Sequence, residues 1–427
     1  MVVKNVFDIL EERGFVEDVT HPELRTLLEK PAKVYCGFDP TADSLHVGSL
    51  VPIMGLAWFQ RCGHTPVAIV GGATGMIGDP SGKAVERQLL DEMVIAKNLV
   101  GIRKNLETVL VSGDSQNRPL ILNNLDWFRH FTFVDFLRDV GKYFRIGPML
   151  AKESVKLRIN SEEGMSFTEF SYQLLQGYDF LHLFRELGVT VQLGGSDQWG
   201  NITAGTDLIR KVLGKSAYGI TFPLLTRSDG QKFGKSEQGT IWLAPEKCSP
   251  YEFYQYFIRV TDADVIKLMK LLTFMDMAEI RQFEAAMARP DYQPNTAQRR
   301  LAEEVTRLIH GPEGLETALK VTKGAAPGSD TVLDAAILES IARDMSHKDL
   351  PMASVSGAKV IDLLVQLEMQ ASKGEARRLV KNGGVYLNNQ KITDENYAIA
   401  QSDLIEGKML LLAAGKKHKV ILKVINP

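Results

Sequence analysis

Short apolar runs alternate with helical periodicity over the first half of the chain. Residues 34–38, 67–70 and 189–193 are apolar and have the length of buried strands. Each run leads into turn-forming residues and then into a stretch whose apolar positions recur every three or four residues. This alternation predicts an α/β fold in which crossover helices join the strands of a parallel sheet. Because such sheets bind ligands beyond the carboxyl ends of their strands, the turns after these runs mark the expected site.

The strongest helical pattern lies at residues 166–187, where apolar residues form a stripe along one face. Residues 249–323 are helical in pattern but more charged, which predicts a small helical subdomain. Two turn-rich stretches then bound a linker, and a second compact unit begins near Gly357. The sequence therefore predicts four parts: a Rossmann-like parallel-sheet domain over residues 1–225, a loop with a helical subdomain over 226–324, a linker segment over 325–356, and a small α+β domain over 357–427.

The turn after the first strand has residues suited to bind phosphate. Pro40 breaks the strand, and Asp43 or Ser44 is expected to cap a new helix with His46 in its first turn. Free backbone amides at a helix start favour anions, and an imidazole there is suited to donate to phosphate oxygens. Gly48 allows a nucleotide to approach the backbone closely. An ordinary strand-to-helix turn with a surface histidine would look the same, so this motif alone decides nothing.

The turn after the second strand is rich in glycine over residues 71–82. Asp79 is suited to bind an ammonium group, and Lys83 with Arg87, four residues apart, to face a polyphosphate. The spacing is not that of a P-loop, because no Gly-Lys-Ser or Gly-Lys-Thr occurs at the required place. The alternative is a plain loop in which Asp79 precedes a proline as a turn former.

Two further motifs follow in chain order. Asp197 comes after the third strand, where acidic residues of nucleotide-binding folds accept hydrogen bonds from ribose hydroxyls. Lys232 and Lys235 lie three residues apart in a loop and are suited to close over the β- and γ-phosphates of a nucleotide. Each motif alone is a common turn or a solvated lysine pair. Together with His46, in this order, they predict a pocket in which ATP activates a carboxylate.

The strong helix has a polar stripe made by Tyr172, Gln176 and Asp179. Their spacing of four and three residues places them on one face. A solvated stripe is the ordinary interpretation of such a pattern. Tyrosine is an unusual residue for a solvent face, however, and apolar residues flank the stripe. We therefore expect Asp179 to be partly buried and to need a partner.

Composition narrows the class of protein. The 427 residues have a net charge of −2, so the chain as a whole lacks the excess of basic residues that is typical of nucleic-acid-binding proteins. Residues 357–427, however, have a net charge of +4 from 11 basic and 7 acidic residues, which hints that this region binds a polyanion. Cys36, Cys62 and Cys248 show no paired spacing, so we expect no disulfide framework, no structural metal and a reducing compartment. No apolar run is long enough to span a membrane, and the N-terminus has no signal-peptide pattern.

The motifs jointly resemble those of bacterial-type tyrosyl-tRNA synthetases, which are class I aminoacyl-tRNA synthetases. Residues 35–46 carry part of the likeness, and His46-Val47-Gly48-Ser49 is similar to the class I signature His-Ile-Gly-His, with serine in the last place. Lys232-Phe233-Gly234-Lys235-Ser236 is similar to the Lys-Met-Ser-Lys-Ser loop of the same class. Near the C-terminus, residues 372–388 resemble a small RNA-binding module shared with a small-subunit ribosomal protein. The resemblance covers nearly the whole chain.

The resemblance implies a reaction and its partners. L-tyrosine would react with ATP, accompanied by Mg²⁺, to give tyrosyl-adenylate and pyrophosphate, and the tyrosyl group would pass to the terminal ribose of tRNA(Tyr). The protein would be a cytoplasmic homodimer with no membrane association. By resemblance, the catalytic residues are His46, Lys83, Arg87, Lys232 and Lys235. The tyrosine-binding residues are Tyr35, Asp79, Tyr172, Gln176, Asp179 and Gln198. The ATP-binding residues are Cys36, Gly37, Asp39, His46, Gly48, Ser49, Gly195, Asp197 and Lys235. The RNA-binding residues are Arg377, Arg378 and Lys381.

Two alternatives remain at this point. One is the tryptophanyl relative with the same core. Tyr35 and Asp179 argue against it, because a substrate phenol would donate to Asp179 and accept from Tyr35, whereas indole offers only a donor. The other is an RNA-binding protein of the same fold without enzymatic activity. His46, Asp197 and the two loop lysines argue against it, while Ser49, in place of the last histidine of the class signature, is the one departure that keeps it open.

Overall fold

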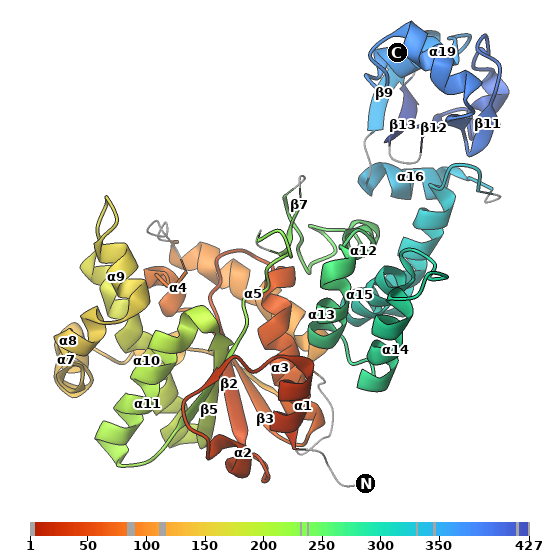
Figure 1. Ribbon diagram of the computed structural model, residues 1–427. Helices are drawn as coiled ribbons and strands as arrows, with labels where there is room; N and C mark the ends of the chain where they lie inside the picture. Colours follow the sequence, from red (N-terminus) through yellow and green to blue (C-terminus); the bar gives the residue numbers. More distant parts are fainter. Residues whose placement is uncertain are drawn as a thin grey trace. The chain divides into compact units, whose positions relative to one another are not determined.

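The computed structural model of the chain (Figure 1) describes residues 5–82, 90–110, 117–230, 233–236, 239–329, 332–344, 347–415 and 418–425. These residues form two compact units. The first contains residues 1–248 and 256–309, and the second contains residues 249–255 and 310–427. None of the helices in the described ranges is long and apolar enough to cross a membrane.

The first unit is built on a six-stranded sheet with the strand order β1-β6-β5-β2-β3-β4. Neighbouring strands are parallel except for β1 and β6, which are antiparallel. The predicted α/β fold with a parallel sheet is therefore confirmed. The strands are β1 Asp18–Val19, β2 Lys33–Phe38, β3 Thr65–Val70, β4 Leu120–Asn123, β5 Val189–Gly195 and β6 Tyr218–Phe222.

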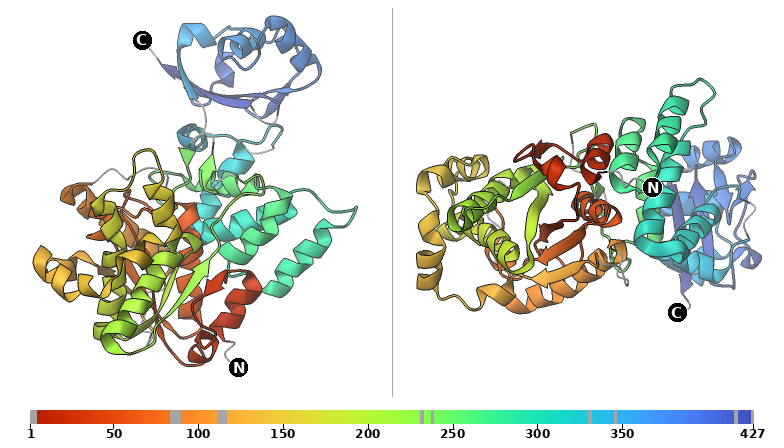
Figure 2. Two further views of the ribbon diagram at one scale, coloured as in Figure 1. Left: turned by 60° about the vertical axis from the view of Figure 1, so that its left-hand side comes forward. Right: turned by 90° about the horizontal axis from the view of Figure 1, so that it is seen from below.

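The chain first builds the sheet outward through β2, β3 and β4 and then returns to the other side of β2 with β5 and β6. The order of strands thus reverses between β2 and β5, and ligands of open α/β sheets bind at such a reversal. Helices cover both faces of the sheet. In Figures 1 and 2, α10 and α11 lie on one face and α1 and α3 on the other.

Many helices of this unit connect the strands or follow them. They are α1 Val6–Arg13, α2 Leu24–Leu27, α3 Leu50–Arg61, α4 Thr74–Ile77, α5 Glu92–Val109, α6 Leu125–Phe128, α7 Phe133–Asp139, α8 Ile146–Leu150, α9 Glu153–Ile159, α10 Phe167–Leu187 and α11 Trp199–Leu213, with short 3₁₀ turns η1 Val47–Ser49, η2 Gly141–Tyr143 and η3 Ser196–Gln198. A small hairpin of β7 Lys235–Ser236 and β8 Gly239–Thr240 follows, and later α13 Asp262–Leu272 and α14 Met277–Met287; helices α12 Pro250–Ile258 and α15 Thr296–Gly324 each contain residues of both units.

The helix predicted at residues 166–187 is confirmed as α10. Its first turn is capped by Ser166, whose hydroxyl accepts a hydrogen bond from the N–H of Glu169 at 3.1 Å. The helix ends at Gly188, which has a φ of 69°. Glycine adopts this left-handed conformation without the steric cost that a side chain adds.

The helix expected to begin at Asp43 or Ser44 does not begin there, so that prediction was wrong. Asp43 forms an ion pair with Lys247 at 2.6 Å, and the Ser44 hydroxyl donates to the Leu45 carbonyl at 2.8 Å. Neither side chain caps a helix. Instead His46 caps η1, its Nδ1 accepting from the Gly48 N–H at 3.0 Å, and α3 begins only at Leu50. The partner of Asp43 lies about 200 residues away in the sequence, so no local pattern could indicate it.

The second unit contains a five-stranded sheet with the order β11-β10-β12-β13-β9, in which only β9 and β13 pair in parallel. The predicted α+β fold of the C-terminal region is confirmed. Its elements are α16 Ala335–Asp344, β9 His347–Pro351, α17 Met352–Val355, α18 Val360–Gln366, α19 Lys373–Lys381, β10 Val385–Leu387, β11 Gln390–Ile392, η4 Gln401–Asp403, β12 Met409–Ala414 and β13 His418–Ile425. Strand β9 lies within the residues that the sequence analysis interprets as a linker; the four-part division itself stays a prediction.

Candidate active site

The predicted motifs lie together at the carboxyl ends of three neighbouring strands. Asp39 directly follows β2, the residues leading to Asp79 follow β3, and η3 with Asp197 follows β5. Strand β2 pairs with both β3 and β5, so the three turns share one edge of the sheet. The site thus lies where the strand order reverses.

Asp39 connects two elements of this site. One carboxylate oxygen accepts a hydrogen bond from the Thr74 hydroxyl at 2.9 Å, and the other accepts from the Tyr172 hydroxyl at 2.8 Å. Gly71 lies so close that an added Cβ would come within 2.3 Å of both Asp39 and Thr74. Only glycine fits at this position without displacing the carboxylate. The turn after β2 and the polar stripe of α10 are therefore in direct contact, which the sequence analysis does not predict.

Asp179 is buried, with an exposed fraction of 4 %. Its carboxylate accepts from Asn124 Nδ2 at 3.0 Å and from the Trp127 indole N–H at 2.8 Å. Burial raises the pKa of Asp179 to about 7, although these two hydrogen bonds act in the opposite direction. The expectation that Asp179 is buried and partnered is met, but the partners come from α6 and the residue before it.

Asn124 and Trp127 are the residues that sequence reasoning missed. Asn124 is fully buried, and its side chain also accepts from the Ala73 N–H at 2.8 Å and donates to the Thr74 hydroxyl at 3.1 Å. It thereby links Asp179 to the Thr74–Asp39 pair through one continuous set of hydrogen bonds. The only signal in the sequence is an asparagine pair that ends a short apolar run, which is also typical of an ordinary turn.

Tyr35 contributes a buried hydroxyl that lacks a partner. The side chain is 1 % exposed and its ring packs against Phe180 at 5.1 Å between centroids. In the described part of the chain its hydroxyl has no hydrogen-bond partner, and neither has the Oε1 atom of Gln192, the residue opposite Tyr35 in β5. Burial, and secondly the negative charge of Asp179, raise the pKa of the Tyr35 phenol. A buried polar group without a partner costs about 1–3 kcal/mol, so such a group at a site edge indicates a polar ligand.

Asp79 lies at the centre of a second polar cluster. Its carboxylate accepts from Gln198 Nε2 at 2.7 Å and from Asn201 Nδ2 at 3.3 Å. Gln176, from the stripe of α10, donates to the side chain of Gln198 at 3.3 Å. The structure therefore brings together three residues of the predicted tyrosine site that lie about 20 to 120 residues apart in sequence. Asn201 is a further member that sequence reasoning missed.

His46 lies in an exposed turn. Because its Nδ1 accepts from the Gly48 N–H, the proton of the neutral ring is on Nε2, which is then the nitrogen that donates outward. A Cβ on Gly48 would lie 2.8 Å from the imidazole, so glycine is needed for the ring to occupy this position. Ser49 lies next to it and ends η1. Binding of phosphate by this outward N–H stays a prediction.

The other predicted nucleotide residues are placed as follows. Cys36 is buried in β2, and burial raises the pKa of its thiol to about 12. Gly37 lies beside it, and Gly195 packs so close to Asp197 that an added Cβ would come within 2.6 Å of that carboxylate. Lys235 is in β7, and its side chain is outside the description. Lys83, Arg87 and Lys232 lie outside the described residues.

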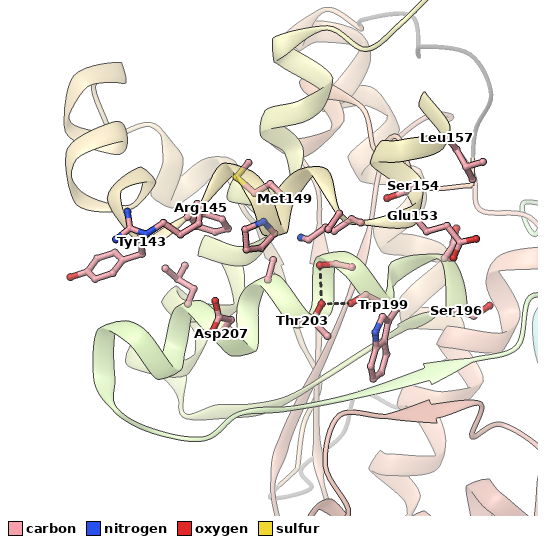
Figure 3. Close-up of a pocket in the computed structure, with 18 of the residues that line it drawn as sticks. Tyr143, Arg145, Met149, Glu153, Ser154, Leu157, Ser196, Trp199, Thr203 and Asp207 are labelled. Atoms are coloured by element: carbon pink, nitrogen blue, oxygen red, sulfur yellow. Dashed lines mark hydrogen bonds between the residues drawn. The ribbon is translucent and has the colours of Figure 1, made fainter. Parts of the chain in front are cut away.

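A cavity of about 620 Å³ opens beside Asp197 (Figure 3). It is lined by residues of η3, α8, α9 and α11, and includes Lys152, Trp199 and Lys211. The ammonium of Lys152 is buried without a hydrogen-bond partner among the residues described, and burial lowers its pKa to about 8. Sequence reasoning missed this cavity, since its basic residues follow no motif.

In the second unit the predicted RNA-binding residues lie on α19. Arg377 and Arg378 are exposed, and Lys381, also exposed, forms an ion pair with Glu395 at 3.3 Å. Ser372 caps helix α19, since its hydroxyl accepts from the Glu375 N–H at 3.3 Å.

Comparisons with known proteins show the family to which the chain belongs. A family model described as tRNA synthetases class I (W and Y) matches residues 27–325, and one described as tyrosine–tRNA ligase SYY-like C-terminal domain matches residues 342–422. Fold, site and the first match thus define a class I aminoacyl-tRNA synthetase. A tyrosine–tRNA ligase of Protochlamydia amoebophila is 67% identical over 422 residues, which are 99% of this chain and 99% of the relative. The chain belongs to the tyrosyl-tRNA synthetases.

The chain is also similar to an organellar tyrosine–tRNA ligase and to two synthetases of known structure. The chloroplastic/mitochondrial tyrosine–tRNA ligase of Arabidopsis thaliana is 54% identical over 427 residues, covering 98% of this chain and 84% of the relative. The crystal structure of a C-terminally truncated Aspergillus nidulans mitochondrial tyrosyl-tRNA synthetase has a TM-score of 0.66 at 34% identity, covering 74% of this chain and 92% of that one. An Encephalitozoon cuniculi tryptophanyl-tRNA synthetase, at 15% identity and a TM-score of 0.55 over 72% of this chain and 87% of its own, shares the fold.

Proposed function

We propose that this protein is a tyrosine–tRNA ligase that uses the site at the ends of β2, β3 and β5 for two reactions. In the first, the carboxylate of L-tyrosine attacks the α-phosphate of ATP, and the bond to the leaving pyrophosphate breaks. In the second, a terminal ribose hydroxyl of tRNA(Tyr) attacks the carbonyl of the tyrosyl-adenylate, and AMP leaves. The observation that carries this proposal is the buried pair of Asp179 and Tyr35: a carboxylate that accepts hydrogen bonds, and a hydroxyl that has no partner among the residues described.

The pair accounts for selection of tyrosine over phenylalanine. The phenol of the substrate donates to Asp179 and accepts from the Tyr35 hydroxyl, which has no other partner in the described part of the chain. Phenylalanine leaves both groups unsatisfied in a dry pocket, and each such group costs about 1–3 kcal/mol. Tryptophan offers a donor to Asp179 but no acceptor for Tyr35. The cluster of Asp79, Gln176 and Gln198 is suited to the other end of tyrosine, with Asp79 and Tyr172 facing its α-ammonium group.

ATP binds, in this proposal, across the turn of His46. The outward Nε2–H of His46 donates to phosphate oxygens as their charge grows, and the Asp197 carboxylate accepts from the ribose. Cys36, Gly37 and Asp39, with Gly48, Ser49 and Gly195, line the nucleotide without supplying a strong base. Catalysis is then positioning and charge stabilisation. The loop residues Lys83, Arg87, Lys232 and Lys235 are assigned to the pyrophosphate by family resemblance.

Mg²⁺ enters with ATP and neutralises charge on the polyphosphate. The carboxylates of Asp39 and Asp79 are already paired with protein donors. This arrangement fits an ion that is held by phosphate oxygens better than one held by the protein.

The tRNA has two contact regions in this proposal. The cavity beside Asp197 is suited to the terminal nucleotides, because Lys152 and Lys211 provide positive charge and Trp199 an aromatic face. Because the cavity lies next to Asp197, the proposed partner of the ATP ribose, its position supports the assignment to the tRNA terminus. In the second unit, Arg377 and Arg378 with Lys381 face solvent on α19 and are suited to RNA phosphates.

We further propose that the protein is a homodimer. The first unit exposes large apolar side chains on α7, α8, α9 and the start of α10, among them Phe133, Ile146, Leu157 and Phe167, each more than 60 % exposed. These helices lie together in Figure 1. Exposed apolar groups of this size are typical of a protein interface, and family resemblance makes a second copy the occupant. The three cysteines are all free thiols, which fits a cytoplasmic location.

Steady-state pyrophosphate exchange tests the assignment of Asp179. We expect Asp179→Ala to raise the KM of tyrosine about 30-fold or more, as for loss of a buried hydrogen bond to a charged group, while the KM of ATP stays within about twofold. Asp126→Ala is the matched control, since Asp126 is an exposed carboxylate near Trp127. Equal loss of tyrosine and ATP affinity in Asp179→Ala would contradict the assignment.

A further inference from the structure

The turn that carries His46 is connected by backbone hydrogen bonds to residues about 190 positions later. The N–H of Val47 donates to the Ile241 carbonyl at 3.0 Å, and the N–H of Ile241 donates to the Gly234 carbonyl at 2.9 Å. The backbones of His46 and Trp242 form an antiparallel bridge beside this contact. The position of the His46 turn is therefore set by the peptide groups of Gly234 and Ile241.

Tyr256 of α12 continues this chain of hydrogen bonds. Its phenol oxygen accepts from the Gly234 N–H at 2.8 Å. Gly234 is buried and has a φ of 91°, so its N–H is turned away from the regular pairing of a strand. A Cβ at Gly234 would lie 3.4 Å from the Gly48 nitrogen, which shows how closely the two turns approach. The hydrogen bonds thus run without interruption from Tyr256 through Gly234 and Ile241 to Val47.

The ring of Tyr256 is held in place by two aromatic neighbours. Phe233 packs edge-on against it at 5.1 Å between centroids, and Phe257 does so at 5.4 Å. Phe233 is 5 % exposed, and its N–H donates to the Leu225 carbonyl at 3.1 Å. Substitution of Tyr256 by phenylalanine keeps these ring contacts and removes only the hydroxyl.

A second set of hydrogen bonds holds the residues that precede Gly234 in the chain. Asp264 of α13 is 6 % exposed, and its carboxylate accepts from the N–H of Ser228 at 2.9 Å and from the Thr261 hydroxyl at 2.8 Å. Helices α12 and α13 therefore hold the described residues both before and after positions 231–232, at Ser228 and at Gly234.

We infer that Tyr256 is a positioning residue for the turn of His46, acting through the peptide groups of Gly234 and Ile241. The inference rests on the proposed function, in which this turn receives the phosphates of ATP. Without the hydroxyl, the buried Gly234 N–H loses its acceptor, and the turn has more than one position available. In the proposed function, tyrosine binds beside the buried side chains of Asp179 and Tyr35. The hydrogen bonds from Tyr256 to Val47 do not reach these two residues. The consequence is therefore specific to ATP.

Pyrophosphate exchange by Tyr256→Phe tests the inference. Loss of one neutral hydrogen bond corresponds to a change of about threefold to tenfold. We expect kcat/KM for ATP to fall by this factor while the KM of tyrosine is unchanged. Tyr292→Phe is the matched control, because the Tyr292 hydroxyl also accepts from a backbone N–H, that of Ala297 at 2.8 Å, at the start of α15. An equal effect on ATP and tyrosine, or the same loss in the control, would overturn the inference.

A double-mutant cycle with His46→Ala separates positioning from general loosening of the structure. If Tyr256 acts through the His46 turn, Tyr256→Phe has little further effect once His46 is replaced. Full additivity of the two substitutions would contradict the inference.

Direct measurement of ATP binding distinguishes failure of the inference from failure of the proposed function. Absence of tyrosine-dependent exchange in the unaltered protein would refute the proposed function alone. In that case calorimetric titration with ATP decides about Tyr256: weaker binding by Tyr256→Phe than by Tyr292→Phe supports the inference, and equal binding overturns it.

Discussion

At the scale of single residues, the site contains two tyrosines in opposite situations. The hydroxyl of Tyr172 is hydrogen-bonded to Asp39, whereas the hydroxyl of Tyr35 lacks a partner in the described structure although both side chains are buried. A buried hydroxyl without a hydrogen-bond partner does not stabilise the fold. Its use must come from a ligand, and the proposed phenol of tyrosine supplies the missing partner.

This difference leads to a prediction about stability and binding together. We expect Tyr35→Phe to leave the free energy of unfolding unchanged or to raise it by up to about 1 kcal/mol, because it removes a buried unsatisfied group. The same substitution should raise the KM of tyrosine about threefold to tenfold. Urea unfolding of the ligand-free protein and pyrophosphate exchange measure the two effects. Tyr172→Phe, which breaks a hydrogen bond, is expected to lower stability instead. Destabilisation by Tyr35→Phe as large as that by Tyr172→Phe would show that its hydroxyl has a structural partner.

The sequence indicated the site residues that stand in compact motifs and missed those that only support them. Asp79, Gln198 and Tyr172 were predicted from turns and helical spacing, together with the family resemblance. Asn124 and Trp127, which hold Asp179, have no pattern of their own, because a hydrogen bond across about 50 residues leaves no periodic signal. Residues in recognisable motifs could thus be predicted from the sequence. The residues that hold them in place by hydrogen bonds could be identified only from the structure.

At the scale of elements, the three central strands β2, β3 and β5 were predicted from the sequence, whereas β1, β4 and β6 were not. Strands β2 and β3 lie inside the sheet, and helices cover both faces, so their sequences are almost continuously apolar. The start of α3 was not predictable in the same way. Asp43 and Ser44 have the residue types of helix caps, but an ion pair with Lys247 and a hydrogen bond to Leu45 occupy them. A cap contributes only about 1 kcal/mol, and Asp43 is instead held by an ion pair with a residue about 200 positions away in the sequence.

Arg13, at the end of α1, contacts both α13 and α3 in the first unit. Its guanidinium is buried and donates to the carbonyls of Lys270, Thr273 and Met275, which follow or end α13. It also stacks over the Trp58 ring of α3 at 4.3 Å. Burial lowers the pKa of Arg13 to about 10, so the group stays charged at neutral pH.

We expect Arg13→Met to destabilise the protein by about 2–4 kcal/mol, because three buried carbonyls lose a charged donor. The midpoint of urea unfolding measures this loss. Arg25→Met is the control: Arg25 forms an exposed ion pair with Asp8 at 2.8 Å, and such pairs contribute only about 0–1 kcal/mol. A similarly small loss in the free energy of unfolding in both variants would contradict the prediction that Arg13 stabilises the packing of these helices.

At the scale of the whole molecule, the two units divide the proposed work. The first unit holds the described residues of the amino-acid and nucleotide site, and the second presents Arg377 and Arg378 on α19. In the proposed function, adenylate formation is expected to need only the first unit, whereas charging of tRNA is expected to need both. The two reactions therefore separate the roles of the units without any truncation, which would disturb the sheet because β9 and β13 pair across residues 347–425.

The most direct test of the account is the transfer of labelled tyrosine to tRNA(Tyr), measured beside tyrosine-dependent pyrophosphate exchange. The unaltered protein is expected to do both. A variant with Arg377→Glu and Arg378→Glu is expected to keep its exchange rate but to lose about tenfold or more in charging, with a reduced dependence on salt. Absence of charging by the unaltered protein, or equal loss of exchange and charging in the variant, would contradict the account.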